Sequence, residues 1–453
     1  MKKLLTIALT ALLSLCMLAG MAACNIDTGD EQSGNTGVSS EENPDATVEL
    51  TVGTLATEYE QSLMQEWINQ FQREHSEVSI KITRTFQGMA EIIDMKNMGV
   101  LPDIVWTAGD QHSNFSGSDH FYDLSDETRF PGSAEFFADF YPALIETTHY
   151  SADDDGIWFV PRDYNRIVVY LNATVFEQLG IDVPDADWTW EDFEAVCEQL
   201  MPANETAKVR RALEWKSWPP LWTTMLYNFG GAYFNDDGTP VLDSPETQAC
   251  FDYLGEFLST YTLTGTGNSF KSFSVDNLGA SVPMIFDVRP QLSEYMQAAY
   301  NQGFELQVLP FPNFVQEDGS AGYTGAGCSG YAITTACTDS EELEWAWKFL
   351  QYCMSEAGYE DVGYLGNIVP ALMSLADTGS WTTYSYGGMS VDYTAFTADN
   401  TEDLFLNYYN VVDWQYHDSI RQEVAMFWDR VQTYTYTNAI EAFNTNIEDI
   451  LNG

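Results

Sequence analysis

Two arginines and an aspartate lie between two apolar runs in the stretch GIWFVPRDYNRIVVYL, residues 156–171. Arg162, Asp163 and Arg166 stand out because the chain has only 18 Lys and Arg against 68 Asp and Glu. Charged side chains between strands can bind a polar ligand, or they can form a buried ion pair that joins two parts of a structure. The residues alone leave both roles open for Arg162 and Asp163.

Four other side chains have types and positions that suit ligand binding. Trp106 ends the run PDIVW and Asp110 follows it closely, and ligands gather where strands end in open α/β sheets. Trp218 and Trp222, in KSWPPLWTTM, lie where a loop enters a helix beside two prolines. Sugars offer apolar faces and many hydroxyls, so they call for aromatic rings and carboxylate, amide or guanidinium partners. These residue types suit a carbohydrate site, but most aromatic side chains pack in a core, so the tryptophans could also be core residues, and only one of Trp218 and Trp222 is expected to bind.

Weaker candidates are spread along the chain. Asp287 and Arg289, in IFDVRP, follow a predicted strand and precede a helix, although Asp287 could simply cap that helix. Glu58 follows the first predicted strand, and Trp381 could close the site from the C-terminal part. The glycine-rich loop 325–330 could approach a ligand with its backbone or could form a tight turn.

The sequence offers little for catalysis or metal binding. The five histidines are scattered, and GCSGY (327–331) does not have the spacing of a serine hydrolase nucleophile. Carboxylates are plentiful, so a secreted glycoside hydrolase is one alternative, but no pair is marked out. Five cysteines beyond Cys24, without a CxxC, argue against zinc and a disulfide scaffold; Cys328 and Cys337 are the one close pair to test. We predict no catalytic residue, no metal site and no cofactor.

The net charge of −50 excludes ordinary nucleic-acid binding, which needs clustered Lys and Arg, and disfavours adsorption of the folded body to anionic lipid. A length of 453 residues predicts two or three domains or two large lobes.

The N-terminus reads as a secretory signal over residues 1–23, with Lys2 and Lys3, an apolar run and then small residues. A transmembrane helix is the alternative for such a run. The end of this segment, Met21-Ala22-Ala23-Cys24, resembles the lipobox of bacterial lipoproteins, which implies that Cys24 is lipidated and anchors the protein outside the cell. Residues 24–46 are polar and acidic and predict a flexible tether.

The elements that must position these residues follow an α/β pattern. Strand, helix, strand, helix and strand are predicted over 46–106, and buried strands recur at 167–171, 283–287, 306–310 and 331–335. Thr189 and Asp339 predict helix starts, and the last seventy residues are expected to be mostly helical. We therefore expect two α/β lobes with a hinge and a cleft between them: approximately 47–160 with 287–340, and approximately 165–285 with 341–453.

Several segments, in order, resemble the extracellular sugar-binding proteins of bacterial ABC importers, the family that includes maltose-binding protein. They are LTVGTLATEYEQSLMQEWINQFQREHSEVSIKI, LPDIVW, the block VPRDYNRIVVYLNATVFEQLGIDVPDADWTWEDF, GGAYFNDDGTPVLDSPETQACFDYL, VPMIFDVRP and SGYAITTACTDSEELEWAWKFLQY. The likeness covers about residues 47–452.

This resemblance implies a type II periplasmic-binding-protein-like fold that captures a carbohydrate, an oligosaccharide in particular, and delivers it to an ABC permease in the membrane. It implies a monomer without a cofactor, and it places 161–166 where the chain crosses between lobes. Some members bind other polar solutes, such as sugar phosphates or amino-acid derivatives, which is the second alternative. An anionic ligand would need the few arginines at 162, 166 and 289.

Overall fold

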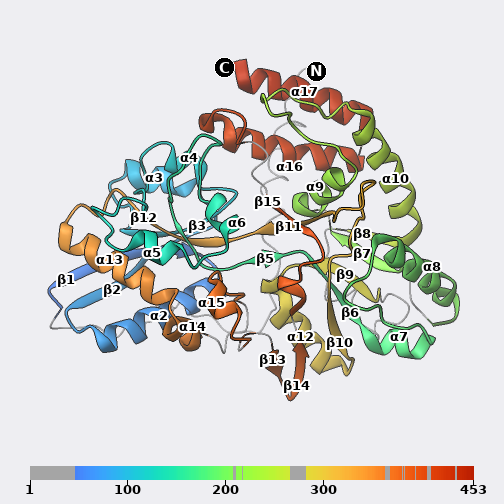
Figure 1. Ribbon diagram of the computed structural model, residues 1–453, viewed down its shortest axis with the longest axis horizontal. Helices are drawn as coiled ribbons and strands as arrows, with labels where there is room; N and C mark the ends of the chain where they lie inside the picture. The colour runs from blue at the N-terminus through green and yellow to red at the C-terminus, as the bar shows by residue number, and fades with distance from the viewer. Residues whose placement is uncertain are drawn as a thin grey trace, which may run out of the picture. The chain divides into compact units, whose positions relative to one another are not determined.

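The structure is a computed structural model that describes residues 46–207, 211–216, 218–265, 282–362, 368–379, 381, 383–392, 394–405, 410–433 and 436–452. The expected signal, the lipidated Cys24 and nearly all of the tether lie outside these residues. Within the described residues the fold is mixed α/β with two lobes, as the sequence predicts (Figure 1).

The first lobe is built on a five-stranded sheet. Its order is β2 (Val78–Phe86), β1 (Val48–Leu55), β3 (Ile104–Ala108), β12 (Ser329–Ile333) and β4 (Val160–Pro161). β1 runs parallel to β2 and β3, whereas β12 is antiparallel to β3 and β4. Helices α2 (Glu58–Glu74) and α13 (Ser340–Cys353) pack on this sheet, and the lobe also holds α3 (Glu91–Asn97), α4 (Ser113–Ser116), α5 (Ser133–Phe137), α6 (Pro142–Glu146) and α14 (Glu356–Val362).

The second lobe has a five-stranded sheet in the order β10 (Leu306–Pro310), β6 (Val168–Asn172), β9 (Met284–Asp287), β7 (Leu213–Lys216) and β8 (Thr262–Gly265). The two strands β6 and β9 are buried on both faces, with five and four buried residues in succession. Its helices are α7 (Ala173–Leu179), α8 (Trp190–Ala207), α9 (Pro219–Asn228), α10 (Pro245–Tyr261), η1 (Arg289–Gln291), α12 (Leu292–Gln302), α16 (His417–Thr433) and α17 (Tyr436–Asn452).

A small sheet joins the lobes, with β11 (Tyr323–Gly327) between β15 (Glu402–Phe405) and β5 (Asn165–Arg166) (Figure 1). β5 and β11 belong to the two stretches in which the chain passes from one five-stranded sheet to the other. The remaining elements are α15 (Met373–Ala376), the hairpin β13 (Thr383–Tyr386) and β14 (Met389–Asp392), η3 (Thr394–Thr397) and η4 (Trp414–Tyr416). The hairpin contacts α12 and β10 of the second lobe, η3 contacts β5 and β10, and η4 contacts α16 and α4.

The structure differs from the expected lobe boundaries in two segments. β10 pairs with β6, so α12 and β10 belong to the second lobe and not to the first. α13 packs on α2 and β1, and α14 packs on α2, so both belong to the first lobe and not to the second. The expectation of a mostly helical C-terminal part is wrong for 383–405, which contains β13, β14 and β15. Apolar periodicity reveals strands and helices, but not which sheet or core receives them, because that depends on pairing between distant segments.

Candidate functional site

A pocket of about 330 Å³ lies between the lobes, at the edge of both main sheets. Its volume is at the lower end of the range for small-molecule sites. Residues of the first lobe, the second lobe and the crossing stretches all contribute to its lining: Glu60, Trp106, Gly109, Asp110, Thr147, Arg162, Asp163, Asn165, Ile167, Trp218, Pro220, Val288, Pro290, Gly325, Ala326, Gly327, Cys328, Ser329 and Phe405. A ligand here would contact both lobes at once.

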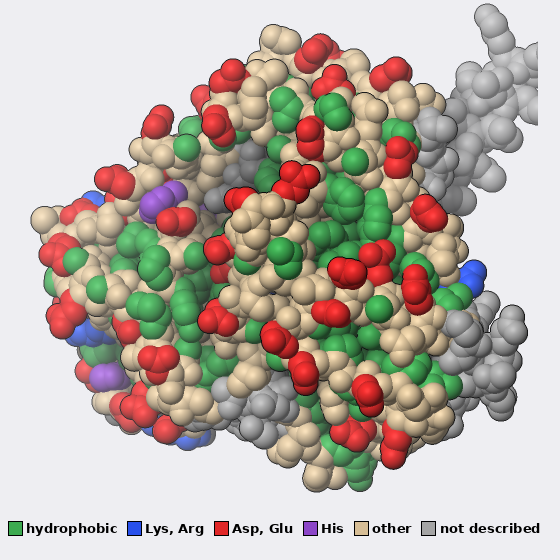
Figure 2. Space-filling model, turned by 45° about the vertical axis from the view of Figure 1, so that its right-hand side comes forward, with side chains coloured by type: hydrophobic (Ala, Val, Ile, Leu, Met, Phe, Trp, Pro, Cys, Tyr) green, Lys and Arg blue, Asp and Glu red, His purple; other side chains and the backbone are tan. Residues whose placement is uncertain are grey.

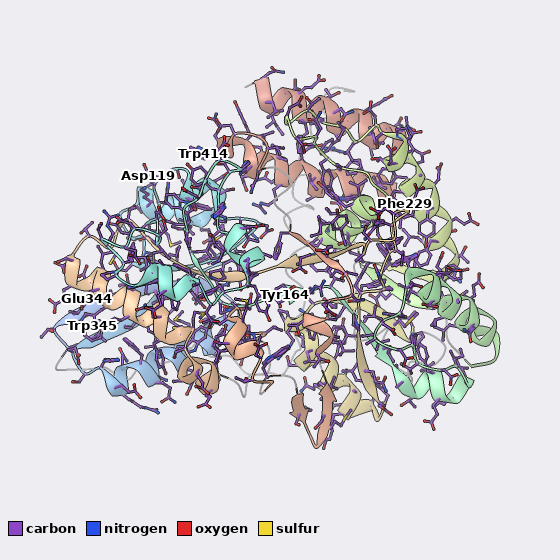
Figure 3. The ribbon with its side chains drawn as sticks, in the orientation of Figure 1. Asp119, Tyr164, Phe229, Glu344, Trp345 and Trp414 are labelled. Carbon is purple, nitrogen blue, oxygen red and sulfur yellow. The ribbon has the colours of Figure 1, made fainter. Side chains whose placement is uncertain are left out.

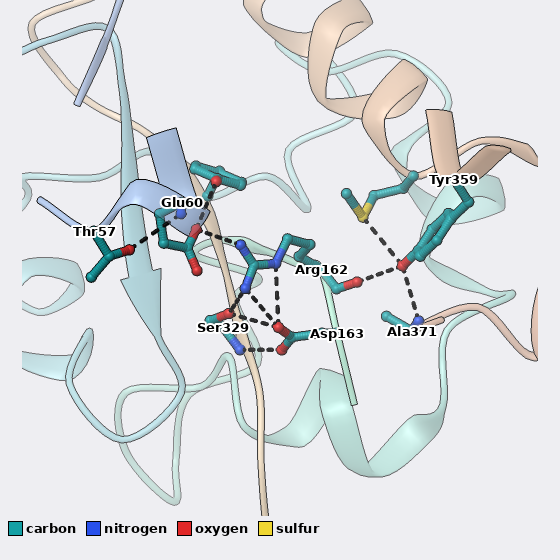
Figure 4. Close-up of polar contacts among 9 residues, drawn as sticks. Thr57, Glu60, Arg162, Asp163, Ser329, Tyr359 and Ala371 are labelled. Carbon is teal, nitrogen blue, oxygen red and sulfur yellow. Dashed lines mark hydrogen bonds and ion pairs between the residues drawn. The ribbon is translucent and has the colours of Figure 1, made fainter. Parts of the chain in front are cut away.

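The floor of the pocket is a buried ionic network around Arg162 (Figure 4). Its Nη1 donates to Oε2 of Glu60 at 2.6 Å, and its Nη2 donates to Oδ2 of Asp163 at 2.7 Å and to Oγ of Ser329 at 2.6 Å. Oδ1 of Asp163 accepts the backbone N–H of Ser329 at 2.7 Å. The three charged residues are each 6% exposed or less, so each charge depends on the opposite charges beside it to offset the cost of its burial. Arg162 therefore acts as the cation that holds two carboxylates where the crossing stretch meets the first lobe.

This network is fixed from both sides. Thr57 caps α2 by accepting from the backbone N–H of Glu60, which places that carboxylate at the first turn. Tyr331 donates to Oε2 of Glu60 at 3.4 Å, and the hydroxyl of Tyr359 donates to the backbone carbonyl of Arg162 (Figure 4). The floor is thus positioned by α2, β12 and α14 before any ligand arrives.

Arg166 lies next to this floor but ties the joining sheet together. Its Nε forms an ion pair with Oδ1 of Asp403 at 2.7 Å, and its Nη2 donates to the carbonyl and hydroxyl oxygens of Thr401 at 2.7 and 2.8 Å. Tyr164, which Figure 3 shows between the lobes, donates its hydroxyl to the same carboxylate. These contacts give Arg166 a structural role at the crossing.

Trp106 and Asp110 bring an indole and a carboxylate to the pocket from the end of β3. All five residues of β3 are buried, so the sheet fixes the position of Trp106, which is 8% exposed. No hydrogen-bond partner for its Nε1 is found among the described residues. Burial raises the pKa of Asp110, and the positive charge of Arg421 in α16 opposes that rise.

Comparison with known proteins agrees with this geometry. The family described as bacterial extracellular solute-binding protein matches residues 66–386, well over half of the 453 residues. The chain belongs to this family. The two-lobed type II architecture and the resemblance seen in the sequence are thereby confirmed.

Individual relatives of this solute-binding protein are distant. It is 22% identical to the multiple sugar-binding protein of Streptococcus mutans over 141 residues, 31% of this chain and only 30% of that protein. The GacH receptor of Streptomyces glaucescens, solved unliganded and with acarbose, is 14% identical in sequence. The structural match covers 89% of this chain and 98% of that chain, with a TM-score of 0.67. Maltose-bound MalE3 of T. maritima is 15% identical in sequence, and the match covers 89% of this chain and 100% of that chain with a TM-score of 0.65.

A third solved structure is UgpB of Mycobacterium tuberculosis in complex with glycerophosphocholine, which is 16% identical in sequence. The match covers 89% of this chain and 98% of that chain, with a TM-score of 0.67. At such identities the likeness establishes the fold alone. Among the described residues, no helix combines the length and the apolar character needed to cross a membrane.

The structure brings five of the predicted site residues together in the pocket of this solute-binding protein: Trp106, Asp110, Arg162, Asp163 and Trp218. Trp218 precedes α9 in an extended conformation, and Pro219 occupies the first helical position. This half-buried indole therefore enters the pocket from the second lobe, across from Trp106.

Trp222 lies instead in the core of the second lobe. Its ring stacks on that of Trp428 at a centroid distance of 5.1 Å and lies 5.3 Å from that of Trp215. It is 3% exposed and does not line the pocket. Its place in the helix directs it toward α16 and the sheet.

The remaining candidates also lie outside the pocket lining. Asp287 accepts from the hydroxyl of Tyr295 at 2.7 Å, and Arg289 is 1% exposed, with its guanidinium 5.7 Å from the ring centroid of Phe396. Glu58 is exposed on the first turn of α2, and Trp381 donates its Nε1 to the carbonyl of Ala376 at 2.9 Å. The loop around 289 still contributes, because its neighbours at 288 and 290 line the pocket.

Sequence reasoning did not single out five pocket residues with polar or aromatic side chains: Glu60, Thr147, Asn165, Ser329 and Phe405. Glu60 follows an N-cap threonine by three residues, a spacing that reads as helix capping and gives no sign of its partner Arg162. Phe405 lies in a short strand that the sequence did not indicate. Ser329 belongs to the glycine-rich loop, whose approach to the pocket the sequence did suggest as one of two readings.

Among the described residues the cysteines form no disulfide, and one group with the spacing of metal ligands lies outside the pocket. Cys328 and Cys337 are free thiols, so the pair is not bridged in this structure. Asp103, Cys337 and Glu342 come within 4.8 Å of one another. Burial raises the pKa of Cys337, which disfavours the thiolate that metals bind, and Asp103 accepts the N–H and hydroxyl of Thr51 at 2.8 and 2.7 Å.

Behind the pocket, His112 is held neutral. Its Nε2 donates to the carbonyl of Thr147 at 2.9 Å, and its Nδ1 lies 2.8 Å from the hydroxyl of Ser116. Burial lowers the pKa of His112 from 6.5 to about 3. The unfolded chain therefore takes up a proton on this residue at a higher pH than the folded chain.

We expect this difference to contribute to acid destabilisation. Stability from His112 is complete above about pH 6.5 and declines toward pH 3, with a slope of up to about 1.4 kcal/mol per pH unit. The free energy of unfolding, measured by chemical denaturation across this range, should fall less steeply in His112→Gln. His149→Gln removes a half-buried histidine of the same lobe as a control. Equal slopes in wild type and His112→Gln would contradict the assignment.

Proposed function

We propose that this solute-binding protein captures a neutral carbohydrate in the interlobe pocket and delivers it to the permease of an ABC importer. The observation that carries the proposal is the pairing of Trp106 and Trp218, which enter one pocket from opposite lobes. Two indoles can cover the apolar faces of a sugar ring while nearby carboxylates accept its hydroxyls. The sugar-binding relative and the saccharide-bound structures support the carbohydrate class; the sequence favours an oligosaccharide.

The charge of the pocket supports a neutral ligand over an anionic one. Its lining contains three carboxylates and one guanidinium, a formal charge of −2 when all are ionised. The guanidinium of Arg162 already bonds to Glu60 and Asp163, so it is poorly placed to meet a phosphate or carboxylate. Acidic side chains are also spread over the visible surface (Figure 2), where they disfavour the approach of anions.

The same contacts argue for binding without catalysis. Glycoside hydrolysis uses two carboxyl groups, one as acid and one as base or nucleophile. Two of the three pocket carboxylates are bonded to Arg162, which makes them poor proton donors or nucleophiles. The third pocket carboxylate, Asp110, interacts with the charge of Arg421 instead, and one carboxylate does not supply both roles.

Capture then follows from the fold. A ligand that contacts both lobes stabilises the closed arrangement over the open one, with the bending absorbed where the chain crosses between sheets. We further propose that Cys24 is lipidated after removal of residues 1–23, so that a monomeric body is tethered on the outer face of the membrane beside the permease.

Thermal unfolding of residues 47–453 with a panel of solutes tests this function. A ligand bound only by the folded state adds RT ln(1 + [L]/Kd) to the stability and raises the midpoint. We expect a rise with one or more neutral mono- or oligosaccharides, no turnover of that sugar, and no rise with sugar phosphates or amino acids. A rise with anionic solutes alone would overturn the neutral-sugar assignment.

A further inference from the structure

A segment of the second lobe touches the first lobe beside the pocket. Trp414 begins η4, just before α16, and lies against Gly117 at the end of α4. A Cβ added to Gly117 would lie 2.5, 2.7 and 2.9 Å from three atoms of the indole, so the contact leaves no room for any side chain. Figure 3 shows Trp414 beside the loop that carries Asp119.

The glycine is explained by this contact and not by its backbone. Gly117 has φ −65° and ψ −20°, a conformation that every residue type adopts readily. The approach of the indole is therefore what excludes a Cβ at this position.

Charged groups form a second contact between the same two elements. A small gap of about 40 Å³ is lined by Asp110 and Asn114 of the first lobe and by His417, Asp418 and Arg421 of α16. Arg421 donates to Asp418 at 2.5 Å, and its charge also attracts the carboxylate of Asp110. Because Asp110 lines the main pocket as well, this contact lies directly at the edge of the ligand site.

The touching segment is internally braced. His417 is buried and donates its Nε2 to the carbonyl of Val412 at 2.9 Å, and Asp413 caps η4 by accepting from the N–H of Gln415 at 3.1 Å. The carbonyl of Asn410 accepts from the backbone N–H of Ala152 in the first lobe at 3.3 Å. Residues 410–421 can thus act as one rigid piece.

We propose that residues 410–421 form a clasp that holds the two lobes together over the pocket, with Trp414 on Gly117 as its main contact and Arg421 linking it to Asp110. Trp414 and Arg421 are positioning residues for ligand capture: the contact is made only when the lobes meet, so it adds to the closed state and slows ligand release. This inference rests on the proposed capture of a ligand in the pocket.

The first test uses a saccharide that raises the unfolding midpoint. Gly117→Ala should displace the indole and weaken binding about tenfold, if the closed fraction falls by the same factor. Trp414→Ala should weaken it similarly, and adding Gly117→Ala to Trp414→Ala should cost nothing more, because the clash is gone. Gly255→Ala is the control, since a Cβ there meets nothing within 4 Å. Unchanged affinities, or costs that simply add, would overturn the clasp.

The second test needs no ligand for its first step. In Gly117→Cys/Trp414→Cys the new Cβ at 117 lies close enough to position 414 for a disulfide, whereas the five described native cysteines are buried. We expect mild oxidation to cross-link the pair and not the single variants, and the bound saccharide to leave the oxidised form more slowly than the reduced form.

The outcomes separate the two proposals. No cross-link, either without or with the saccharide, would show that the lobes do not meet at Gly117, and a cross-link without slower release would show a contact that is no clasp. If no solute in the panel binds, the proposed function fails, and the cross-link still decides whether the lobes meet there.

Discussion

Replacing Arg162 by methionine should lower the free energy of unfolding by about 3–5 kcal/mol. Methionine fills much of the same space but removes the guanidinium, so the carboxylates of Glu60 and Asp163 stay buried without a cation. Both are 6% exposed or less, and their mutual repulsion adds to the desolvation of each. Chemical denaturation of Arg162→Met against wild type measures the loss.

A surface pair gives the matched control. Lys81 and Glu49 form an ion pair at 3.7 Å with side chains 38% and 75% exposed, so Lys81→Met should cost less than about 1 kcal/mol. Adding Glu60→Gln and Asp163→Asn to Arg162→Met should recover part of the loss, because no charge then remains buried. A loss for Arg162→Met as small as that for Lys81→Met would show that the buried network contributes no more stability than a surface ion pair.

The two roles that the sequence left open for Arg162 and Asp163 are both present in the structure. They line the pocket, and with Glu60 they also form a buried ionic network that ties the crossing stretch to the first lobe. The sequence revealed their place because apolar runs flank them, but it could not reveal Glu60, which lies 102 residues earlier. Arg166 forms an ion pair with Asp403, which lies 237 residues later in the sequence, and no local pattern indicates this partner.

Local sequence patterns predicted the helices and strands well where nearby residues determine them, through alternation, apolar spacing and helix capping. The alternation over 46–54, the apolar spacing of 58–74 and the capping Asp339 correspond to β1, α2 and α13, and Asp339 does accept from the N–H groups of Glu341 and Glu342. The allocation of 292–310 and 340–353 to lobes was wrong. It depends on contacts between segments far apart in the sequence, such as the antiparallel pairing of β10 with β6, which local patterns do not reveal.

The tryptophans of KSWPPLWTTM show how one turn of backbone separates binding from packing. Spacing of four residues would place Trp218 and Trp222 on one helix face. Trp218, however, is the N-cap of α9 with φ −137° and ψ 119°, outside the helix proper. Its side chain thus lines the pocket, while that of Trp222 packs into the core. Predicting this difference would require knowing which residue is the first of the helix, which sequence patterns do not give.

Substituting these two tryptophans by alanine should therefore have opposite consequences. Trp222→Ala removes a stacked ring from the core and should cost about 3–5 kcal/mol of stability. Trp218→Ala should cost little stability but about 2 kcal/mol of binding, roughly a thirtyfold rise in Kd, as expected for a central aromatic contact.

Denaturation curves and calorimetric titration with a bound saccharide measure both quantities on both variants. Each variant is the control for the other, since the same side chain is lost four positions apart. If Trp222→Ala, measured where it remains folded, weakened binding more than Trp218→Ala, the pocket between the lobes would not be the ligand site. Loss of affinity confined to Trp218→Ala would instead place the ligand against the indole that enters from the second lobe, opposite Trp106.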